Sequence, residues 1–433
     1  MKQNGRTIGG HIAIFAGTLL LSWVLLFLSA LISNEAIREN MERSALHYRQ
    51  LDAFQFHDGE RWNAIGDNYA DAIWMNVSWH MGEGSLFVST LNTRYYDGGE
   101  YGENAGLYRS VTEGAQPNQD YTRYWHGSAA FIRLLHLVTD VEGIKTIGLA
   151  VTLLLAAVTV ALLVRAKHAD VALLLAFSLA AVQVWNIHLS LEYQPAFVLT
   201  FLLCPMYLML ERRGDQYLTG LSVVGGVAIA FFDFLTTETM TILLPLILVV
   251  AVRAKEGRLG AFRDSLWLLV RCGICWGAAY AATFLVKWTA ASLLTGEDAF
   301  ALALNSAAER VGGVVDPSQM APASIFSSIL ANLTVLFGGT ARVQAGRALM
   351  GTGVFLLALL SVWYLFRRKK ADRPAAALLL LLGSVVFVRY LVLNNHSYLH
   401  EFFTYRALVS PVLAVLLALR LNIELPQKKR GRR

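Results

Sequence analysis

Charged residues are scarce in this chain. Only 16% of its 433 residues are Asp, Glu, Lys or Arg, and 55% are hydrophobic. Soluble globular domains carry roughly a quarter of their residues as charges. Because so few charges cannot cover the surface of a soluble protein of this length, the composition excludes that class. It predicts an all-α polytopic membrane protein.

Several chemical signatures are also missing. The chain has only three cysteines, and Cys272 and Cys275 lie inside an apolar run with no second pair at metal-ligand spacing. That context gives no reason to expect a metal centre there. The chain lacks a Walker A loop, a GxSxG elbow and a nucleotide-binding fingerprint. The usual motifs for P-loop hydrolysis, serine hydrolysis and nucleotide binding are therefore excluded.

Long apolar runs are what the chain has instead. A run of about 20 residues crosses roughly 30 Å of hydrocarbon as a helix. By this criterion we expect about ten spans, at residues 8–32, 144–164, 171–189, 195–210, 217–232, 239–252, 266–290, 348–366, 375–393 and 407–422. The apolar stretch 325–338 is predicted to be re-entrant or interfacial. An eleventh span there would put the later basic clusters on the opposite side of the membrane from the earlier ones.

The short basic connections set the orientation. Lys and Arg gather at places separated by even numbers of predicted spans, at 2–6, 165–167, 212–213, 253–263, 367–373 and 428–433. The positive-inside rule predicts that all of these, and both chain ends, lie in the cytoplasm beneath the plasma membrane. The formal net charge of +6 then reflects orientation and contact with anionic membrane lipid, and we expect no nucleic-acid partner.

This threading divides the chain into parts with different environments. Residues 1–32 form a cytoplasmic N-terminus and the first span, and residues 33–143 form an extracytoplasmic loop domain. Spans two to seven lie within residues 144–290, and residues 291–347 form an extracytoplasmic segment with the re-entrant or interfacial stretch. Spans eight to ten lie within residues 348–422, and residues 423–433 form a basic cytoplasmic tail. The loop domain is dense in Trp and Tyr, which predicts a packed fold with interfacial helices. No part on the cytoplasmic side is large enough for a nucleotide-sugar domain, so a donor is expected to arrive from the membrane or the outside.

Ionisable residues at the outer ends of the spans are the first candidates for chemistry. A charge at membrane depth costs several kcal/mol, so such residues tend to face a cavity or a partner. The set predicts a polar cavity open to the outside: Glu192, Asp233, Glu238, Arg389, His396, His400, Glu401 and Arg406. His396 and His400 stand at i,i+4, a spacing that can bind a divalent metal, but no third ligand stands at protease spacing.

The loop domain supplies a second group of candidates. In the string GDNYADAIWMNVSWH, helical spacing puts Asp67, Asp71 and Trp74 on one face. A carboxylate held against an aromatic ring can have a pKa near working pH and act as a general base, although either Asp can also be a helix cap or a solvated side chain. The string before the second span can bind phosphate and stack on a sugar, or simply anchor at lipid headgroups: Arg123, Tyr124, Trp125 and His126.

The layout resembles that of the GT-C glycosyltransferases, integral membrane enzymes that use polyprenyl-phosphate sugars. The likeness rests on a first span followed at once by a long acidic outer loop, an RYWHG string leading into the second span, and a bundle with basic inner loops. It covers most of the chain and is architectural. It implies transfer of a sugar from a lipid-linked donor to a glycan, lipid or protein acceptor on the outside.

The resemblance also implies roles for the candidate residues. Asp71 is the expected base, with Asp67 behind it and Glu35 at the place where the family usually has its catalytic acid. Arg123 and Arg406 are the expected phosphate ligands, supported by His396 and His400. The pocket is expected to include Trp74, Tyr124, Trp125, His126, Glu192, Asp233, Glu238 and Tyr405. No residue is assigned to a metal, and a divalent metal cofactor is left open.

Two other function classes share these features. A transporter or flippase for a lipid-linked or anionic substrate would have the same polar cavity, but it predicts inverted repeats with broken helices, and the sequence has no internal repeat. A non-catalytic partner of another membrane enzyme would explain the weak motifs. Formation of a glycosidic bond distinguishes the transferase from both.

Overall fold

The protein is almost entirely helical. The computed structural model describes residues 2–296, 298–312, 322, 324–340, 345–367 and 372–422. Within them, seven helices are long and apolar enough to cross a membrane: α1 (Lys2–Ala30), α7 (Val141–Arg165), α10 (Asp215–Phe232), α12 (Phe262–Thr295), α15 (Ala345–Arg367), α16 (Arg373–Val392) and the stretch Glu401–Leu421, which ends in α19 (Val409–Leu421). The chain is thus a helical membrane protein.

Three further predicted spans fall on shorter helices. These are α8 (Ala169–Ala181), α9 (Gln194–Leu210) and α11 (Met240–Lys255). At 1.5 Å per residue, the 13 residues of α8 reach only about 20 Å. The expected span 171–189 is wrong in its extent, because Gln183 adopts a left-handed conformation and the chain continues as the 3-10 helix η4 (Val184–Leu189).

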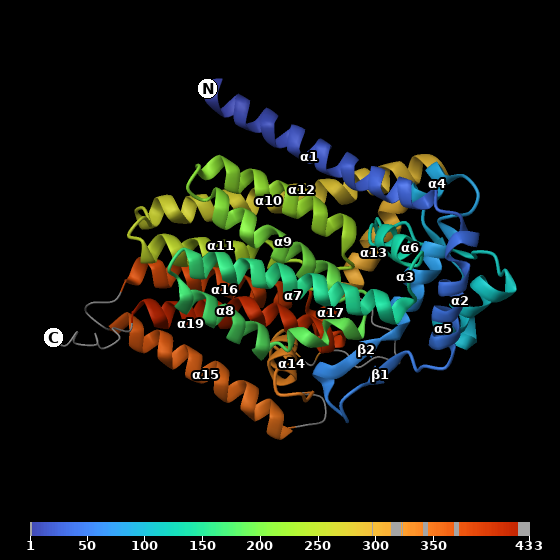
Figure 1. Cartoon of the computed structure of the whole chain (residues 1–433). Helices are drawn as coiled ribbons and strands as arrows, with labels where there is room; N and C mark the ends of the chain where they lie inside the picture. The colour runs from blue at the N-terminus through green and yellow to red at the C-terminus, as the bar shows by residue number, and fades with distance from the viewer. Residues whose placement is uncertain are drawn as a thin grey trace, which may run out of the picture.

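Ion pairs join several basic connections at one end of the bundle. Lys255 at the end of α11 and Arg420 near the end of α19 both pair with Asp170 at the start of α8. Arg253 Nε lies 3.1 Å from the carboxylate of Glu211, just after α9. The connections α7–α8, α9–α10 and α11–α12 therefore share one face with the end of α19, as even span numbers require. The loop domain lies at the other end (Figure 1).

The loop domain packs around a buried helix. It contains α2 (Asn34–Arg49), β1 (Phe54–Phe56), η1 (Trp62–Ala64), β2 (Ile65–Asp67), α3 (Asn68–His80), α4 (Leu86–Leu91), β3 (Arg94–Tyr95), η2 (Gly99–Tyr101), α5 (Gly102–Tyr108), η3 (Arg109–Glu113), β4 (Gln119–Asp120) and α6 (Ala129–Leu135). Strands β1 and β2 pair antiparallel, with Phe54 opposite Asp67, and β3 pairs with β4. Almost all of α3 is buried, so it is an interior helix of the loop domain.

The second outer segment completes this end of the molecule. It holds α13 (Ala299–Val311) and α14 (Ser327–Val335), and the chain later returns through α17 (Asn394–Leu399), α18 (Glu401–Thr404) and η5 (Tyr405–Leu408). Nine residues of α14 reach only about 14 Å, too short to cross a bilayer. Parts of the expected segment 291–347 and of the basic cluster 367–373, and all of the tail 423–433, lie outside the described residues.

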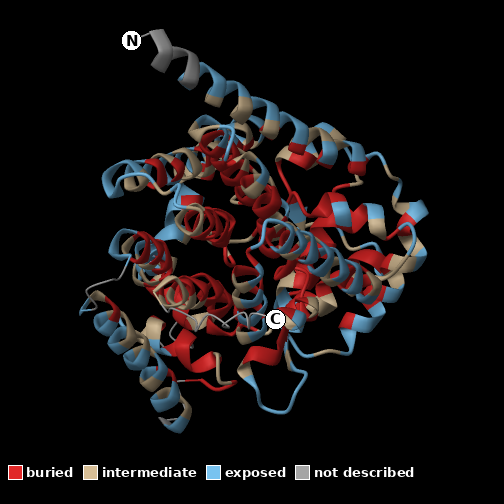
Figure 2. Ribbon diagram, turned by 60° about the vertical axis from the view of Figure 1, so that its left-hand side comes forward, coloured by how far each residue is buried: buried red, intermediate tan, exposed pale blue. Residues whose placement is uncertain are grey.

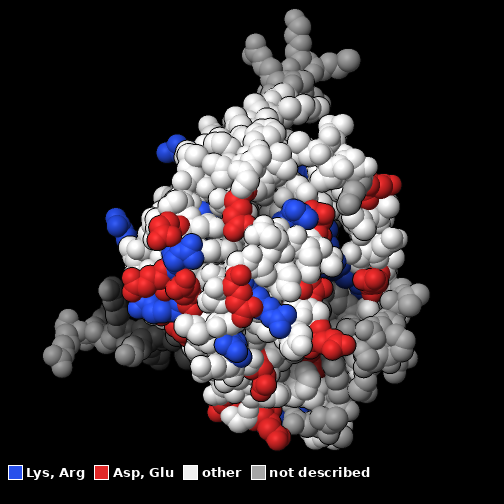
Figure 3. Space-filling model, turned by 90° about the vertical axis from the view of Figure 1, so that its right-hand side faces the viewer, with Lys and Arg blue, Asp and Glu red and all other residues white. Residues whose placement is uncertain are grey.

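The pattern of exposed side chains differs between the helix bundle and the loop domain. Figure 2 shows buried residues concentrated in the inner helices and where the helices meet the loop domain. Helices α1 and α15 expose many large apolar side chains, among them Leu20, Leu21, Leu349 and Leu357. Such apolar exposure is what lipid-facing helices require. The outer face of the loop domain instead carries scattered acidic and basic side chains (Figure 3).

Candidate functional site

Two buried carboxyl groups meet where the loop domain contacts the bundle. Asp67 ends β2 and caps α3, accepting a 2.9 Å hydrogen bond from Ala70 N. Glu192 lies between η4 and α9, and its carboxyl donates a hydrogen bond to Asp67. Burial raises the pKa of Asp67 to about 7 and the pKa of Glu192 well above its usual range. Near neutral pH, Glu192 thus keeps a proton and Asp67 can accept one.

Asp71 is buried one helical turn further along α3, and its oxygens are fully engaged. Oδ1 accepts hydrogen bonds from Ser190 Oγ at 2.6 Å and Leu191 N at 2.7 Å. Oδ2 accepts one from Tyr48 Oη at 2.6 Å and lies 3.3 Å from Lys145 Nζ. These four contacts occupy both carboxylate oxygens, so neither oxygen is free to meet a substrate hydroxyl, and removing the carboxylate would leave a buried lysine unpaired. Asp71 instead joins α3 to α2, α7 and the turn after η4.

Arg406 is buried against Tyr193, the residue that follows Glu192. Its guanidinium lies 4.4 Å from the ring centroid of Tyr193, and the Tyr193 hydroxyl is under the electrostatic influence of both Asp67 and Arg406. Arg406 Nη1 donates to Phe402 O at 3.2 Å, whereas Nε and Nη2 have no hydrogen-bond partner among the described residues. Since buried donors are normally satisfied, the two free N–H groups suit an anionic ligand or water.

Phe234 links the α10–α11 connection to the loop domain. Its ring centroid lies 4.4 Å from Trp74, 4.9 Å from Tyr124 and 4.9 Å from His126. Three of the expected pocket residues, one from α3 and two from the string before α6, therefore surround one ring, and we call this group the Phe234 cage. Within the described part of the chain, the Trp74 indole N–H and His126 Nε2 are buried without a hydrogen-bond partner. Burial lowers the pKa of the His126 imidazole well below its usual value.

Two arginines lie against the same tyrosine. The guanidinium carbon of Arg123 lies 5.7 Å, and that of Arg310 5.9 Å, from the ring centroid of Tyr124. Both side chains bond Ser306, Arg123 to its hydroxyl at 3.0 Å and Arg310 to its carbonyl at 2.8 Å. In the part of the chain that the structure describes, the Nε of each arginine is buried without a hydrogen-bond partner. Two positive charges held this closely favour an anion between them.

The connection between α10 and α11 is held in a defined shape. Arg389 Nε and Nη2 bind the two oxygens of Glu238 at 2.8 and 3.0 Å, and Nη2 also donates to Leu235 O. Leu235 has a left-handed backbone (φ 69°), which costs a branched residue on the order of 1 to 3 kcal/mol. Asp233 accepts from Thr236 N and Oγ1, and burial raises its pKa to about 7.

The two expected histidines lie together, but their contacts are structural. His396 Nε2 bonds Leu235 O at 2.9 Å, and the His396 and His400 ring centroids are 4.8 Å apart. Among the described residues, no three His, Cys, Asp or Glu side chains form a group that could hold a metal ion. His396 therefore supports the α10–α11 connection. The described residues offer no set of ligands for a catalytic metal ion.

Two expected site residues lie away from the carboxyl pair. Glu35 is an exposed side chain at the start of α2, paired with Arg38 at 2.9 Å. Trp125 stacks on Phe231, and its indole N–H donates to a carbonyl of α12. Tyr405 instead lies against the Arg406 guanidinium, whose carbon is 5.0 Å from the Tyr405 ring centroid, and its hydroxyl donates to Val182 O at 3.0 Å. Glu35 thus has a surface position, Trp125 a packing role, and Tyr405 a place beside Arg406.

Sequence reasoning missed several partners. Lys145 and Arg310 occur in helices whose position relative to the loop domain the sequence does not give. Tyr193 was overlooked although it follows Glu192 directly, in the polar string HLSLEYQP. That adjacency was the available signal, because an acidic residue followed by a tyrosine at the end of a span is costly unless the two contribute to a site.

Comparisons with protein-family models, curated proteins and solved structures found no match for this chain. The chemistry of the site is therefore what bears on function.

Proposed function

We propose that this protein is an integral membrane glycosyltransferase of GT-C type, acting at the outer face of the plasma membrane. Its donor is a polyprenyl-phosphate sugar and its acceptor is an outside glycan, lipid or protein. The observation that carries the proposal is the buried pair Asp67 and Glu192 together with Arg406, which has free donors among the described residues and lies against Tyr193, the residue after Glu192. A potential base and a potential phosphate ligand are what this transfer requires.

Asp67 acts as the general base in this mechanism. Its carboxylate takes the proton of the acceptor hydroxyl as that oxygen attacks the anomeric carbon of the donor. The new glycosidic C–O bond forms while the bond from the anomeric carbon to the phosphate oxygen breaks, with inversion. The electron pair of the broken bond leaves on the polyprenyl phosphate, so no strong general acid is needed. The proton on Asp67 then passes to water.

Glu192 tunes the base without contacting the sugar. Because it donates its own proton to Asp67, it keeps that carboxylate oriented and lowers its pKa from what burial alone would produce. A base with a pKa of about 7 combines a useful ionised fraction with real basicity at neutral pH. Asp71 holds α3 in place through Lys145, so that the Asp67 cap of the same helix stays fixed.

The arginines stabilise the leaving phosphate. Arg406 has two free donors near the base, and Arg123 with Arg310 forms a second cationic site across the Phe234 cage. Arginine suits a phosphate because its planar donors can bind two oxygens at once. We assign the phosphate contact to Arg406, since Tyr193 lies against Arg406 and directly follows Glu192 of the carboxyl pair. We assign Arg123 and Arg310, which lie against Tyr124, to the rest of the donor head group.

The orientation belongs to the same proposal. Both chain ends and the ion-paired basic connections face the cytoplasm, and the carboxyl pair faces the outside, by the positive-inside rule. All ten apolar helices then cross or nearly cross the bilayer, with α8, α9 and α11 in a locally thinned region.

Transfer by the purified protein tests this function. The wild type in lipid nanodiscs is incubated with radiolabelled polyprenyl-phosphate sugars and a panel of oligosaccharide and lipid acceptors, and products are separated by chromatography. The proposal predicts a new glycosidic product with release of polyprenyl phosphate. A protein that only moves labelled lipid between leaflets of sealed vesicles is a flippase, and that result would contradict the proposal.

A further inference from the structure

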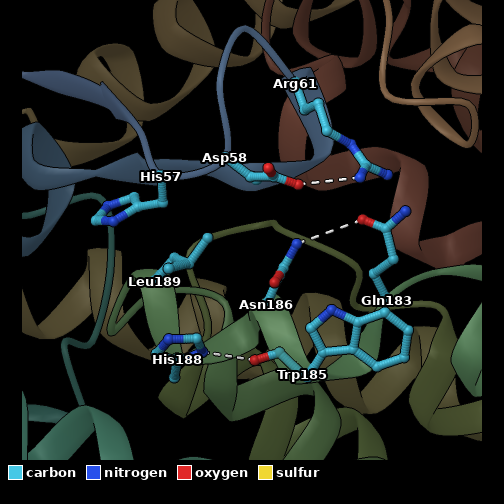
Figure 4. Close-up of a pocket in the computed structure, with 9 residues that line it drawn as sticks. His57, Asp58, Arg61, Gln183, Trp185, Asn186, His188 and Leu189 are labelled. Carbon is cyan, nitrogen blue, oxygen red and sulfur yellow. Dashed lines mark hydrogen bonds and ion pairs between the residues drawn. The ribbon is translucent and has the colours of Figure 1, made fainter.

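A partly open cavity lies beside the carboxyl pair but outside it. Its volume is about 370 Å³, at the lower end of the roughly 300 to 1,000 Å³ of small-molecule sites. It is bounded on one side by the connection from β1 to η1 and on the other by the end of α8 and η4 (Figure 4). None of the expected site residues lines it.

The lining is rich in amide groups and has one large aromatic wall. Trp185 is half-exposed (49%), although a tryptophan is costly to leave in water. Asn186 Nδ2 donates to Asn63 O at 2.9 Å and to Gln183 Oε1 at 3.3 Å, which fixes both amides at the cavity (Figure 4). Amides offer both donors and acceptors, as hydroxyl groups require.

The cavity carries little net charge. Arg61 and Asp58 neutralise each other at 3.0 Å. Partial burial lowers the pKa of His57 from its usual value, so the imidazole is mostly neutral at pH 7. An anionic ligand would have to compete with Asp58 for the one arginine, whereas an uncharged polyol meets no such competition.

Gln183 is held in a conformation that favours glycine. Its backbone has φ 52° and ψ 57° where α8 ends, a place where helices usually have Gly or Asn. The side chain explains the exception, because its amide oxygen accepts from Asn186 at the cavity wall. A glycine here would relieve the backbone and remove that group.

The cavity is separated from the base by one thin wall. A Cβ on Gly66 would lie 2.8 Å from His57 Nε2 and 2.9 Å from Leu189 O. Gly66 directly precedes Asp67, so the close approach of β2 to η4 sets both the cavity and the position of the carboxylate. The cavity and the Asp67 carboxylate are therefore positioned by the same two segments.

We propose that this cavity is a binding subsite for one neutral pyranose ring of a saccharide, with Trp185 against the apolar C–H face of the ring and the Gln183 and Asn186 amides on its hydroxyls. The assignment of that saccharide as the acceptor rests on the proposed function. The binding itself does not.

Ligand-detected NMR tests the subsite. The full chain in nanodiscs is mixed with the methyl glycosides of glucose, galactose, mannose and N-acetylglucosamine, and with methyl glucuronide as the anionic comparison, and saturation transfer to each is measured. We expect transfer to at least one neutral glycoside, weakened about tenfold by Trp185→Ala and also reduced by Gln183→Gly at an unchanged melting temperature. Trp267→Ala, an exposed tryptophan (57%) on α12, is the matched control and leaves binding unchanged.

The outcomes separate the subsite from the transferase. Saturation transfer to no neutral glycoside, preference for the glucuronide, or binding that survives both Trp185→Ala and Gln183→Gly overturns the subsite. Specific glycoside binding by a protein that makes no glycosidic product keeps the subsite and overturns the proposed function. If Trp185→Ala loses binding together with a lowered melting temperature, that loss reflects misfolding, and Gln183→Gly decides: reduced binding supports the subsite and unchanged binding overturns it.

Discussion

Glu192 donates a hydrogen bond to Asp67, and both carboxyl groups are buried where the loop domain meets the helix bundle. Two such groups share a site only if one keeps its proton, and burial favours that state further. If the shared proton is lost, two buried negative charges repel each other and the fold is destabilised. Because the carboxyl pair costs folding free energy, a role in proton transfer explains its presence better than a role in stability.

Asp67→Asn is expected to make the protein more stable at neutral pH. The amide still caps α3 and accepts from Glu192, and it has no charge to desolvate. Because the folded pKa of about 7 exceeds the ordinary 3.8, folding retains a proton, and the stability due to Asp67 is lost as pH rises from about 4 to 7. Melting temperatures of both proteins at pH 5 and pH 7.5 check this. The gain of the variant should be larger at pH 7.5, and an equal gain at both would contradict the assigned pKa.

Asp71→Asn is expected to destabilise the protein. Removing one member of a buried ion pair leaves Lys145 uncompensated, which costs about 3 to 5 kcal/mol. Denaturation in mild detergent measures the loss. The double variant Asp71→Asn/Lys145→Met removes both charges and should recover part of it. If the single variant is as stable as the wild type and inactive, Asp71 is a base after all.

Arg406→Ala is expected to weaken donor binding about a hundredfold, because a charge-assisted contact to phosphate is worth on the order of 2 to 3 kcal/mol. Arg310→Ala should weaken it less, since Arg123 remains beside Tyr124. Binding of a fluorescent polyprenyl-phosphate sugar to nanodiscs provides the measurement. Arg271→Ala, paired with Asp215 at the opposite end, is the control. Equal affinity in all three variants would remove the arginines from the donor site.

A topology reporter tests the orientation. Fused after Arg433 it should report cytoplasm, and inserted near Gly98 in the loop domain it should report the outside. The ion pairs of Asp170 and Glu211 at one end already require the connections they join to lie on the same side. An external C-terminus would therefore mean that the segment around 325–338 adds a crossing, against the short length of α14.

Sequence alone was sufficient for the class, because the class follows from composition and from the lengths of the apolar runs. It also grouped Glu192, Asp233 and Arg406 at one end of the predicted spans, and contacts such as Trp74 with Phe234 place the loop domain against that end. It could not choose between Asp67 and Asp71. That choice depends on Lys145 and Ser190, which reach Asp71 only through tertiary packing.

Another error had a local cause. The helix expected over 171–189 stops before Gln183, because the polar Gln183 and Asn186 lie at the edge of a cavity rather than in lipid. The burial of α3 could not be predicted either. Asp71 on this helix has buried partners such as Ser190, and no pattern within α3 indicates them.

The most direct test of the account is the pH dependence of sugar transfer by the wild type and by Asp67→Asn. With an assay of labelled polyprenyl-phosphate sugar, the wild-type rate should rise tenfold per pH unit below about 7, where Asp67 ionises, and level off above it. Asp67→Asn should bind the donor normally and lose at least about a hundredfold in rate, the usual contribution of a general base. Full transfer by Asp67→Asn, with the rising limb intact, would contradict Asp67 as the base.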